Sequence, residues 1–206
     1  MKKMLWISMI LTVLSACQNE TKKEVPKSEP TTQKTAKPSF DQKTYKLKGM
    51  VIAKTTFKAF KSKIEAVAAK DGLSGVVDFC QKNALKLTDS MGKAHHVVIK
   101  RTSHKLRNPN NKPDIDEEAV LNEYLKLQKE QKPMTPVVMK DAKGYVHFYA
   151  PIKLKNACLK CHGTPGQEIP EKIAQLIKEK YPNDQATGFK AGELRGIWDI
   201  KFLDQK

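Results

Sequence analysis

Residues 136–152 read PVVMKDAKGYVHFYAPI, two short runs of β-branched and aromatic residues separated by the segment Asp141 to Gly144. Runs rich in Val, Tyr and Phe on either side of Asp and Gly are typical of two strands joined by a tight turn. This stretch therefore predicts a β-hairpin, and the rest of the fold can be built outward from it.

Two further stretches have strand character. Residues 95–103 (HHVVIKRTS) are rich in β-branched residues, and residues 196–202 (GIWDIKF) alternate apolar with polar side chains. Alternation with period two predicts a strand that buries one face, so the final strand is expected to be half-buried. Together with the hairpin, these stretches predict a small antiparallel sheet.

Helical spacing dominates the chain before the sheet. Over residues 50–67 apolar side chains recur at intervals of three and four, at Met50, Ala53, Phe57, Phe60, Ile64 and Val67. This pattern predicts a long helix with one apolar seam, which could serve a homodimer as well as the core. Asp71-Gly72 breaks the pattern, and a second helix is expected to carry Cys80 on its inward stripe.

Shorter helices are expected between and after the strands. One covers residues 116–129 and another starts at Pro170, while the Asn- and Pro-rich residues 106–114 read as a loop. Helices in front, followed by strands interrupted by helices, predict the α+β class: a small antiparallel sheet flanked by helices, with a long N-terminal helix.

The first residues, MKKMLWISMILTVLSAC, have the layout of a bacterial secretory signal. The apolar run from Met4 to Val13 is too short to span a bilayer. Leu14-Ser15-Ala16-Cys17 resembles the lipobox, in which the cysteine becomes the lipidated first residue. We therefore expect residues 1–17 to be a lipoprotein signal. The mature protein is expected in the cell envelope, where Cys17 anchors it to a membrane facing the periplasm or exterior.

Residues 18–43 mix Lys, Glu, Thr, Ser and Pro with little to bury, which predicts a flexible linker. Residues 44–206 are then long enough for one domain. The formal net charge of the chain is +16, but only three of its 38 basic residues are arginine. Base and phosphate recognition relies on the guanidinium group, so nucleic acid is not an expected partner. A lysine surface facing anionic lipid or wall polymers is the simpler interpretation.

Cys158-Leu159-Lys160-Cys161-His162 is a C-x-x-C-H sequence, the attachment motif of c-type haem. The spacing lets each thiol bond to one vinyl group of the porphyrin while the imidazole becomes an axial ligand of the iron. One motif predicts one covalent haem c. The predicted export signal agrees, because c-type cytochromes are assembled outside the cytoplasm.

Two other chemistries use C-x-x-C. A thioredoxin-like redox pair expects a long helix opened by the first cysteine, whereas a loop with Gly163 and Gly166 follows here. A structural zinc site needs two further ligands at matching spacing, and no second C-x-x-C or H-x-x-x-H is present. The ligand on the far side of the iron stays open on spacing alone; the candidates are His95, His96, His104, His147, Met91, Met134, Met139 and Cys80.

Three segments, KRTSHKLRNPNNKPD (100–114), CLKCHG (158–163) and YPNDQATGFKAGELRG (181–196), resemble the family of PAS-like c-type haem domains. Members occur as stand-alone exported haem proteins and as sensory regions of bacterial histidine kinases and chemoreceptors. The likeness covers roughly residues 45 to 203. The chain differs from the family at Ile115-Asp116-Glu117, where an aromatic residue is common, so haem contacts in that loop are expected to differ.

The resemblance implies a PAS-like fold with the haem packed against the sheet. It also implies that Cys80, in the segment FCQKNA, binds the iron opposite His162. Arg101, Arg107 and Arg195 lie in or beside the matched segments, and we expect at least one of them to pair with a haem propionate. Surface salt bridges are the alternative role for these arginines.

A histidine and thiolate pair fills both axial positions, so catalysis is not expected. The favoured function is redox or gas sensing by a membrane-tethered single-haem protein, with a diatomic gas as a possible ligand and an unidentified redox or signalling protein as partner. A low-potential electron carrier of the cell envelope is the first alternative. A haem enzyme, a peroxidase or nitrogen-oxide reductase, is the second, and it would require an open iron site and a distal acid or base such as His96 or His147.

Overall fold

The structure, a computed structural model, describes residues 41–204, so the predicted signal, Cys17 and nearly all of the predicted linker lie outside it. Within these residues the order of the longer elements is α1 (Gln42–His95), β1 (Val97–Thr102), α2 (Ile115–Lys129), β2 (Val137–Lys140), β3 (Val146–Lys153), α4 (Glu171–Lys180) and β4 (Leu194–Phe202). The four strands form one antiparallel sheet in the order β1-β4-β3-β2. The predicted α+β class and the predicted hairpin are confirmed.

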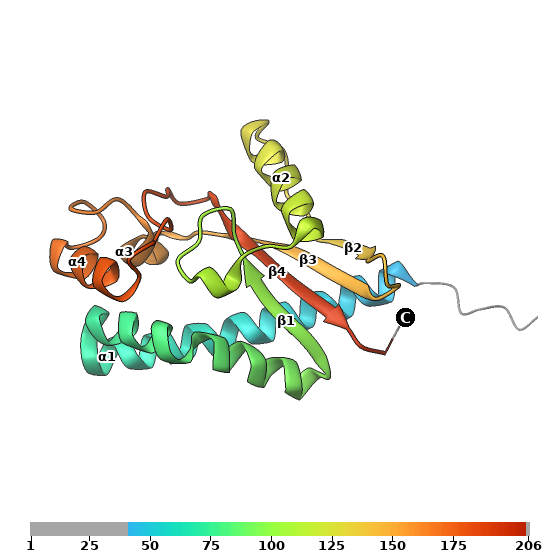
Figure 1. The fold of residues 1–206 in the computed structure, drawn as a ribbon, viewed down its shortest axis with the longest axis horizontal. Helices are drawn as coiled ribbons and strands as arrows, with labels where there is room; N and C mark the ends of the chain where they lie inside the picture. The colour runs from blue at the N-terminus through green and yellow to red at the C-terminus, as the bar shows by residue number, and fades with distance from the viewer. Residues whose placement is uncertain (1–40, 205–206) are drawn as a thin grey trace, which may run out of the picture. The chain divides into compact units, whose positions relative to one another are not determined.

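Helix α1 consists of two arms that fold back on each other (Figure 1). Gly72 joins them with φ 66° and ψ −166°, a backbone conformation that only glycine adopts readily. The first arm runs from Gln42 to Asp71, and the second arm from Leu73 to His95. The break predicted at Asp71-Gly72 is therefore where the chain reverses.

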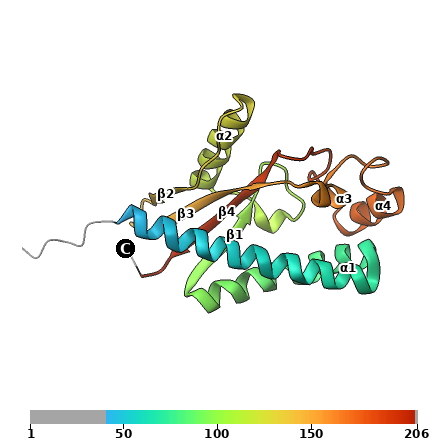
Figure 2. The same ribbon diagram turned by 180° about the vertical axis from the view of Figure 1, so that it is seen from behind.

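The first arm packs along one face of the sheet (Figure 2). Its buried side includes Tyr45, Ile52 and Phe60, which join residues of all four strands in the main hydrophobic cluster. The predicted seam is only partly correct, because Met50 and Phe57 are 48% and 43% exposed.

Gly49 explains how the buried side of the arm is oriented. A Cβ atom at this position would lie 2.5 Å from Cδ2 of Phe148, so the missing side chain lets the helix backbone approach the sheet closely. The helix turns this glycine inward, and Met50 and Phe57 then point outward.

Helix α2 covers part of the opposite face of the sheet (Figure 1). Asp114 caps it: its Oδ1 accepts from the backbone N–H of Glu117, and the Glu117 carboxylate accepts from the backbone N–H of Asp114. Because both faces are covered, Ile197 and Asp199 of β4 are buried as well as Trp198. The prediction of a half-buried final strand is therefore wrong.

The remaining short helices lie at one end of the sheet, next to the reversal of α1 (Figure 1). Ile173, Ile177 and Tyr181 pack against Val77 of the second arm. The α3 turn (Leu159–His162) follows a single 3-10 turn, η2 (Asn156–Cys158). Within residues 41–204, no helix has both the length and the hydropathy needed to cross a membrane.

Candidate haem site

The C-x-x-C-H motif occupies η2 and α3 at this end of the sheet. Cys158, Cys161 and Cys80 are free thiols, each partly buried. Helix α3 contains only four residues and ends at His162, after which the chain turns away at Gly163. A long helix of the thioredoxin type does not follow the first cysteine, which counts against a dithiol redox site.

The segment from Asp184 to Phe189 wraps around the motif. The backbone N–H of Phe189 donates to the carbonyl of His162 at 3.0 Å, and that of Gly188 donates to the carbonyl of Gly163 at 2.8 Å. Phe189, Ala186 and Leu154 bury apolar surface against Cys158 and Leu159. The segment that carries much of the family resemblance therefore serves to hold the motif in place.

The imidazole of His162 is oriented by its Nδ1, which lies 2.8 Å from the backbone carbonyl of Ala186. A hydrogen on Nδ1 donates to that carbonyl, and the Nε2 lone pair is then available to a metal. Burial, together with the positive charges of Arg195 and Arg107, holds the pKa of His162 well below its usual value. The imidazole is therefore neutral, which is the form that binds iron.

Cys80 comes from the second arm of α1, three residues after Val77. Burial raises the pKa of its thiol, the proximity of Cys161 raises it further, and the charges of Arg101 and Arg107 act in the opposite direction. Because such charge effects act over short distances, Cys161, Arg101 and Arg107 lie near Cys80, although 51 or more residues separate these two arginines from the motif cysteines. The sequence-predicted site residues in the described part of the chain converge.

Arg107 already has a carboxylate partner within the protein. Its Nε and Nη2 contact the carboxylate of Asp184 at 3.1 and 3.0 Å, and Nη2 also donates to the carbonyls of Cys161 and Ala186. This ion pair is largely buried rather than on the surface. Arg107 therefore positions the motif and the segment around it.

Arg195 also supports the loops. Its Nη1 donates to Oγ of Ser103 at 2.7 Å and to the carbonyl of Lys105 at 2.9 Å, and the guanidinium lies 5.6 Å from the ring centre of Phe189. Burial lowers the pKa of Arg195 to about 10, with the charge of Arg107 contributing.

Arg101 differs from both. Its guanidinium lies over the ring of Phe60 at 4.0 Å and near that of Trp198, and no carboxylate of residues 41–204 forms an ion pair with it. Its Nε is buried and has no hydrogen-bond partner in the described part of the chain. Burial lowers the pKa of Arg101 to about 10. A buried guanidinium N–H without an acceptor is costly, and a carboxylate is the group that satisfies it best.

These residues fit a haem. Two thiols lie at the attachment spacing, a neutral imidazole has a free lone pair, a third thiol lies nearby, and an unsatisfied guanidinium suits a propionate. His104 adds a further buried nitrogen, Nδ1, without a partner, and its ring lies 5.9 Å from that of Phe189. The described residues 41–204 hold no group of three or more His, Cys, Asp or Glu side chains suited to a metal ion. Haem iron does not need such a group, since the porphyrin supplies four of its ligands.

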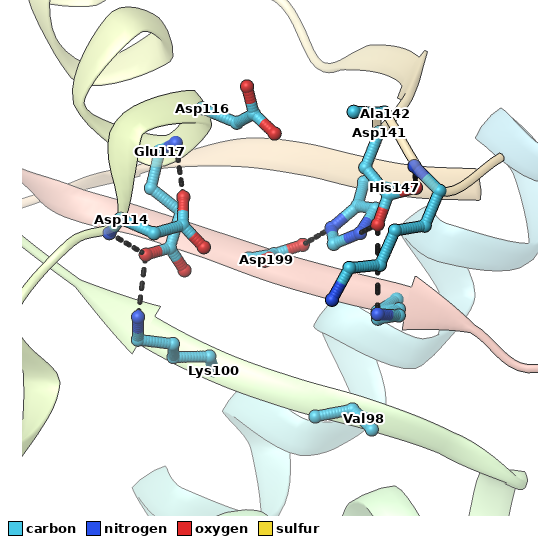
Figure 3. Close-up of a pocket in the computed structure, with 11 residues that line it drawn as sticks. Val98, Lys100, Asp114, Asp116, Glu117, Asp141, Ala142, His147 and Asp199 are labelled. Atoms are coloured by element: carbon cyan, nitrogen blue, oxygen red, sulfur yellow. Dashed lines mark hydrogen bonds and ion pairs between the residues drawn. The ribbon is translucent and has the colours of Figure 1, made fainter. Parts of the chain in front are cut away.

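Apart from His104, the other candidate iron ligands lie elsewhere: Met91 packs against the main hydrophobic cluster and Met134 against the cluster under α2. His95 contacts Thr55 within α1, and Met139 is 45% exposed on β2. His147 lies on the α2 side of the sheet, where its Nδ1 is 2.8 Å from Oδ1 of Asp199 and its Nε2 is 3.5 Å from Oδ2 of Asp141 (Figure 3).

His147 belongs to a polar cluster that the sequence did not reveal. The cluster borders a cavity of about 340 Å³ and includes the ion pair between the half-buried Lys100 and the buried Glu117, with Nζ and Oε2 2.6 Å apart (Figure 3). Burial tends to lower the pKa of His147, but the hydrogen bond and charge of Asp199, with help from Asp141, raise it overall. Burial raises the pKa of Glu117. From the alternation along the strands, these polar residues were expected to face solvent. The cluster becomes evident only in the structure, because α2 covers that face of the sheet.

The fold and the site define an α+β protein with a C-x-x-C-H turn held against the end of a four-stranded antiparallel sheet. The model of the Tll0287-like family matches residues 7–202, and the chain belongs to this family. Its fold is similar to that in the crystal structure of the cyanobacterial heme protein Tll0287. The two share 22% sequence identity and a TM-score of 0.53, over 77% of this chain and 97% of that one. No curated protein sequence matches the chain.

Several residues of the site escaped the sequence analysis. Asp184, Ala186 and Phe189 hold the motif, and Tyr181 lies beneath the guanidinium of Arg107 at 5.9 Å. All four lie in the segment 181–196, which resembles the haem-domain family. That resemblance could have identified them, but it does not by itself assign a role to each residue.

Proposed function

We propose that this chain is an exported, lipid-anchored protein that carries one covalent c-type haem and acts in redox or gas sensing. The observation that carries the proposal is the convergence on one site of the C-x-x-C-H turn, the thiol of Cys80 and the guanidinium of Arg101, whose buried Nε–H has no acceptor. The structurally similar Tll0287 is a haem protein, which supports the choice of cofactor.

Each residue has a distinct task in this proposal. Cys158 and Cys161 would hold the haem through thioether bonds, and His162, through Nε2, and Cys80 would hold its iron. Arg101 offers its unsatisfied Nε–H to a propionate carboxylate. When bound, the haem supplies an iron that changes between ferric and ferrous states, and a thiolate ligand favours the ferric state.

Two side-chain ligands leave no iron position for a substrate, so we propose sensing rather than catalysis. A haem enzyme would also need an acid or base next to the iron. His147 is committed to Asp199 on the other side of the sheet, and His96 is exposed at the end of α1. Neither residue supports the enzymatic alternative.

One observation favours electron transfer as a second candidate. Lys155, Asn156, Ala157 and Lys160, which flank the motif cysteines, are all exposed. If the haem edge that is bonded to these cysteines lies close to solvent, an electron has a shorter path to a partner protein. A carrier would exchange electrons rapidly with small mediators in both iron states, whereas a sensor would change its ligands or its conformation on reduction.

The decisive experiment is expression of the full chain with and without the cytochrome c maturation machinery. We expect a mass increase of one haem and haem-stained bands on a denaturing gel only with the machinery, and none for Cys158→Ser/Cys161→Ser. Ferric wild-type protein should be six-coordinate and low-spin. Cys80→Ser should change the spectrum, and the matched control His147→Gln should leave it unchanged. Colourless protein with the mass of the polypeptide alone would refute haem binding, and an unchanged spectrum of Cys80→Ser would remove Cys80 from the iron.

A further inference from the structure

The first arm of α1 presents an unusual combination of side chains on its exposed side, where Leu47 and Val51 also border a groove next to Val97 and Phe202 at the edge of the sheet. Four of the eight exposed large hydrophobic residues of the described chain lie on it: Leu47, Met50, Val51 and Phe57. Leu47 and Val51 are 57% and 60% exposed. Packing in the core therefore does not account for apolar residues at these two positions. They are surrounded by lysines.

Residues 42–64 of this arm carry charge of a single sign. Residues 42–64 contain seven lysines and no acidic residue, and all seven are exposed. Two of them form ion pairs, Lys48 with Asp204 and Lys61 with Glu65. No carboxylate of residues 41–204 pairs with the other five, which are Lys43, Lys46, Lys54, Lys58 and Lys63.

The lysines and the apolar side chains share one surface because of their spacing. Leu47, Val51, Lys54, Lys58 and Lys61 follow one another at intervals of four and three residues, which places them in a single row along the helix. Met50 and Phe57 lie beside this row. We call these seven residues, with Lys43 and Lys46, the outer face of α1.

We propose that the outer face of α1 is a docking surface for a membrane rich in anionic phospholipids. A helix whose apolar side chains lie among lysines binds in the plane of the bilayer interface. Its apolar groups enter the boundary between headgroups and acyl chains, while the ammonium groups contact lipid phosphates. Each lysine near an anionic surface contributes about 1 kcal/mol to such binding.

A second copy of the chain fits this surface poorly. Pairing two outer faces would bring the lysines of both copies together without a carboxylate from either outer face, and like charges in contact are repulsive. A soluble polyanion would satisfy the lysines but would leave Leu47, Val51 and Phe57 in water. An anionic bilayer satisfies both kinds of side chain.

The position of the arm in the chain agrees with this occupant. Residues 18–41 separate α1 from the predicted lipidation site at Cys17, and 24 residues reach at most about 80 Å when extended. α1 is the first helix of the described residues after that point. The docking surface does not depend on the haem, and it requires lysines and apolar residues rather than the acyl chain itself.

The test uses the full chain bound to vesicles and a local reporter. Phe57→Trp places an indole on the outer face, and Ile115→Trp places one on α2 at a position that is 79% exposed. The background from Trp198 is subtracted with wild-type protein. With brominated lipids in vesicles of phosphatidylcholine and phosphatidylglycerol, we expect quenching of Phe57→Trp and none of Ile115→Trp. Vesicles of phosphatidylcholine alone should give little quenching of either.

Charge variants separate the outer face from net charge. Lys54→Gln/Lys58→Gln/Lys61→Gln should lower the ratio of docked to undocked protein by about a hundredfold. Lys126→Gln/Lys129→Gln/Lys132→Gln removes the same charge from exposed positions at and beyond the end of α2 and should leave that ratio nearly unchanged.

Three results would overturn the proposal. These are equal quenching at both indoles, an equal loss in both triple variants, and a dimer in sedimentation that the outer-face variant abolishes. Leu47→Ser in the Phe57→Trp chain should weaken docking, and no effect there would indicate a polyanion site instead. Loss of lipidation at Cys17 would change only the amount of protein bound to the vesicles. Loss of docking would instead change the quenching of the indole at position 57 in the protein that is bound, so the two failures can be distinguished.

Discussion

Replacing Arg101 should have opposite effects on the free energy of unfolding in haem-free and in haem-loaded protein. Its Nε is buried without a partner, and its guanidinium contacts the ring of Phe60 at 4.0 Å. The fall of the pKa of Arg101 to about 10 corresponds to about 3 kcal/mol of unfavourable free energy for keeping the charge buried. The stacking on Phe60 offsets about 1 kcal/mol of this cost.

Replacement by methionine removes the buried charge and keeps most of the volume. In haem-free protein, we therefore expect Arg101→Met to raise the free energy of unfolding by about 1–2 kcal/mol. In haem-loaded protein the same change should lower it by about 1–3 kcal/mol, since the propionate loses its guanidinium partner. The measurement is urea unfolding followed by circular dichroism, on protein made with and without the maturation machinery.

Arg107→Met is the matched control. Arg107 already has its carboxylate partner, Asp184, and donates to the carbonyl of Cys161. Its replacement leaves a buried carboxylate unpaired and should destabilise both forms by about 3–5 kcal/mol. If Arg101→Met destabilises the haem-free chain, or affects both forms equally, the guanidinium of Arg101 does not bind a haem propionate, and its proposed role is refuted.

Three further changes test the fold and the loops. Gly49→Ala places a Cβ atom against the ring of Phe148 and should lower the free energy of unfolding by about 3 kcal/mol in urea titrations; a loss below about 0.5 kcal/mol would contradict the close approach. The raised pKa of His147 stabilises the fold below about pH 6.5, and this contribution disappears as the pH rises through the folded value. The stability deficit of His147→Gln should therefore be largest in acid and shrink in alkali, and the opposite trend would refute the pairing with Asp199. Asp184→Asn weakens the ion pair that holds the motif and should reduce haem incorporation, measured as the ratio of haem absorbance to protein; full incorporation would count against that role.

The sequence was sufficient for elements that depend on local signals. The hairpin at residues 136–152, the break between two helices at Gly72 and the helix at residues 116–129 are each marked by turn residues or by regular spacing. The orientation of α1 was not predictable, because it depends on the approach of Gly49 to Phe148, 99 residues later in the chain.

The site was predictable only in part, for a related reason. C-x-x-C-H identifies its own residues, and the helical stripe placed Cys80 inward. The contacts that hold the motif join positions far apart in sequence, as between Arg107 and Cys161 or His162 and Ala186. Spacing along one element carries no information about such contacts. The half-buried final strand was a similar error, because alternation along β4 does not reveal that α2 covers its second face.

The three arginines suggest why a chain so rich in lysine keeps guanidinium groups at this end of the sheet. Arg107 and Arg195 donate to backbone carbonyls in the loops, which requires several N–H groups in one plane. Arg101 instead lies close enough to Cys80 for its charge to favour the thiolate, against the burial that keeps the thiol protonated. A thiolate ligand and a propionate are both anions, and burial disfavours both. One buried guanidinium without a partner of its own can stabilise the two together, which a solvated lysine on the outside of the fold cannot do.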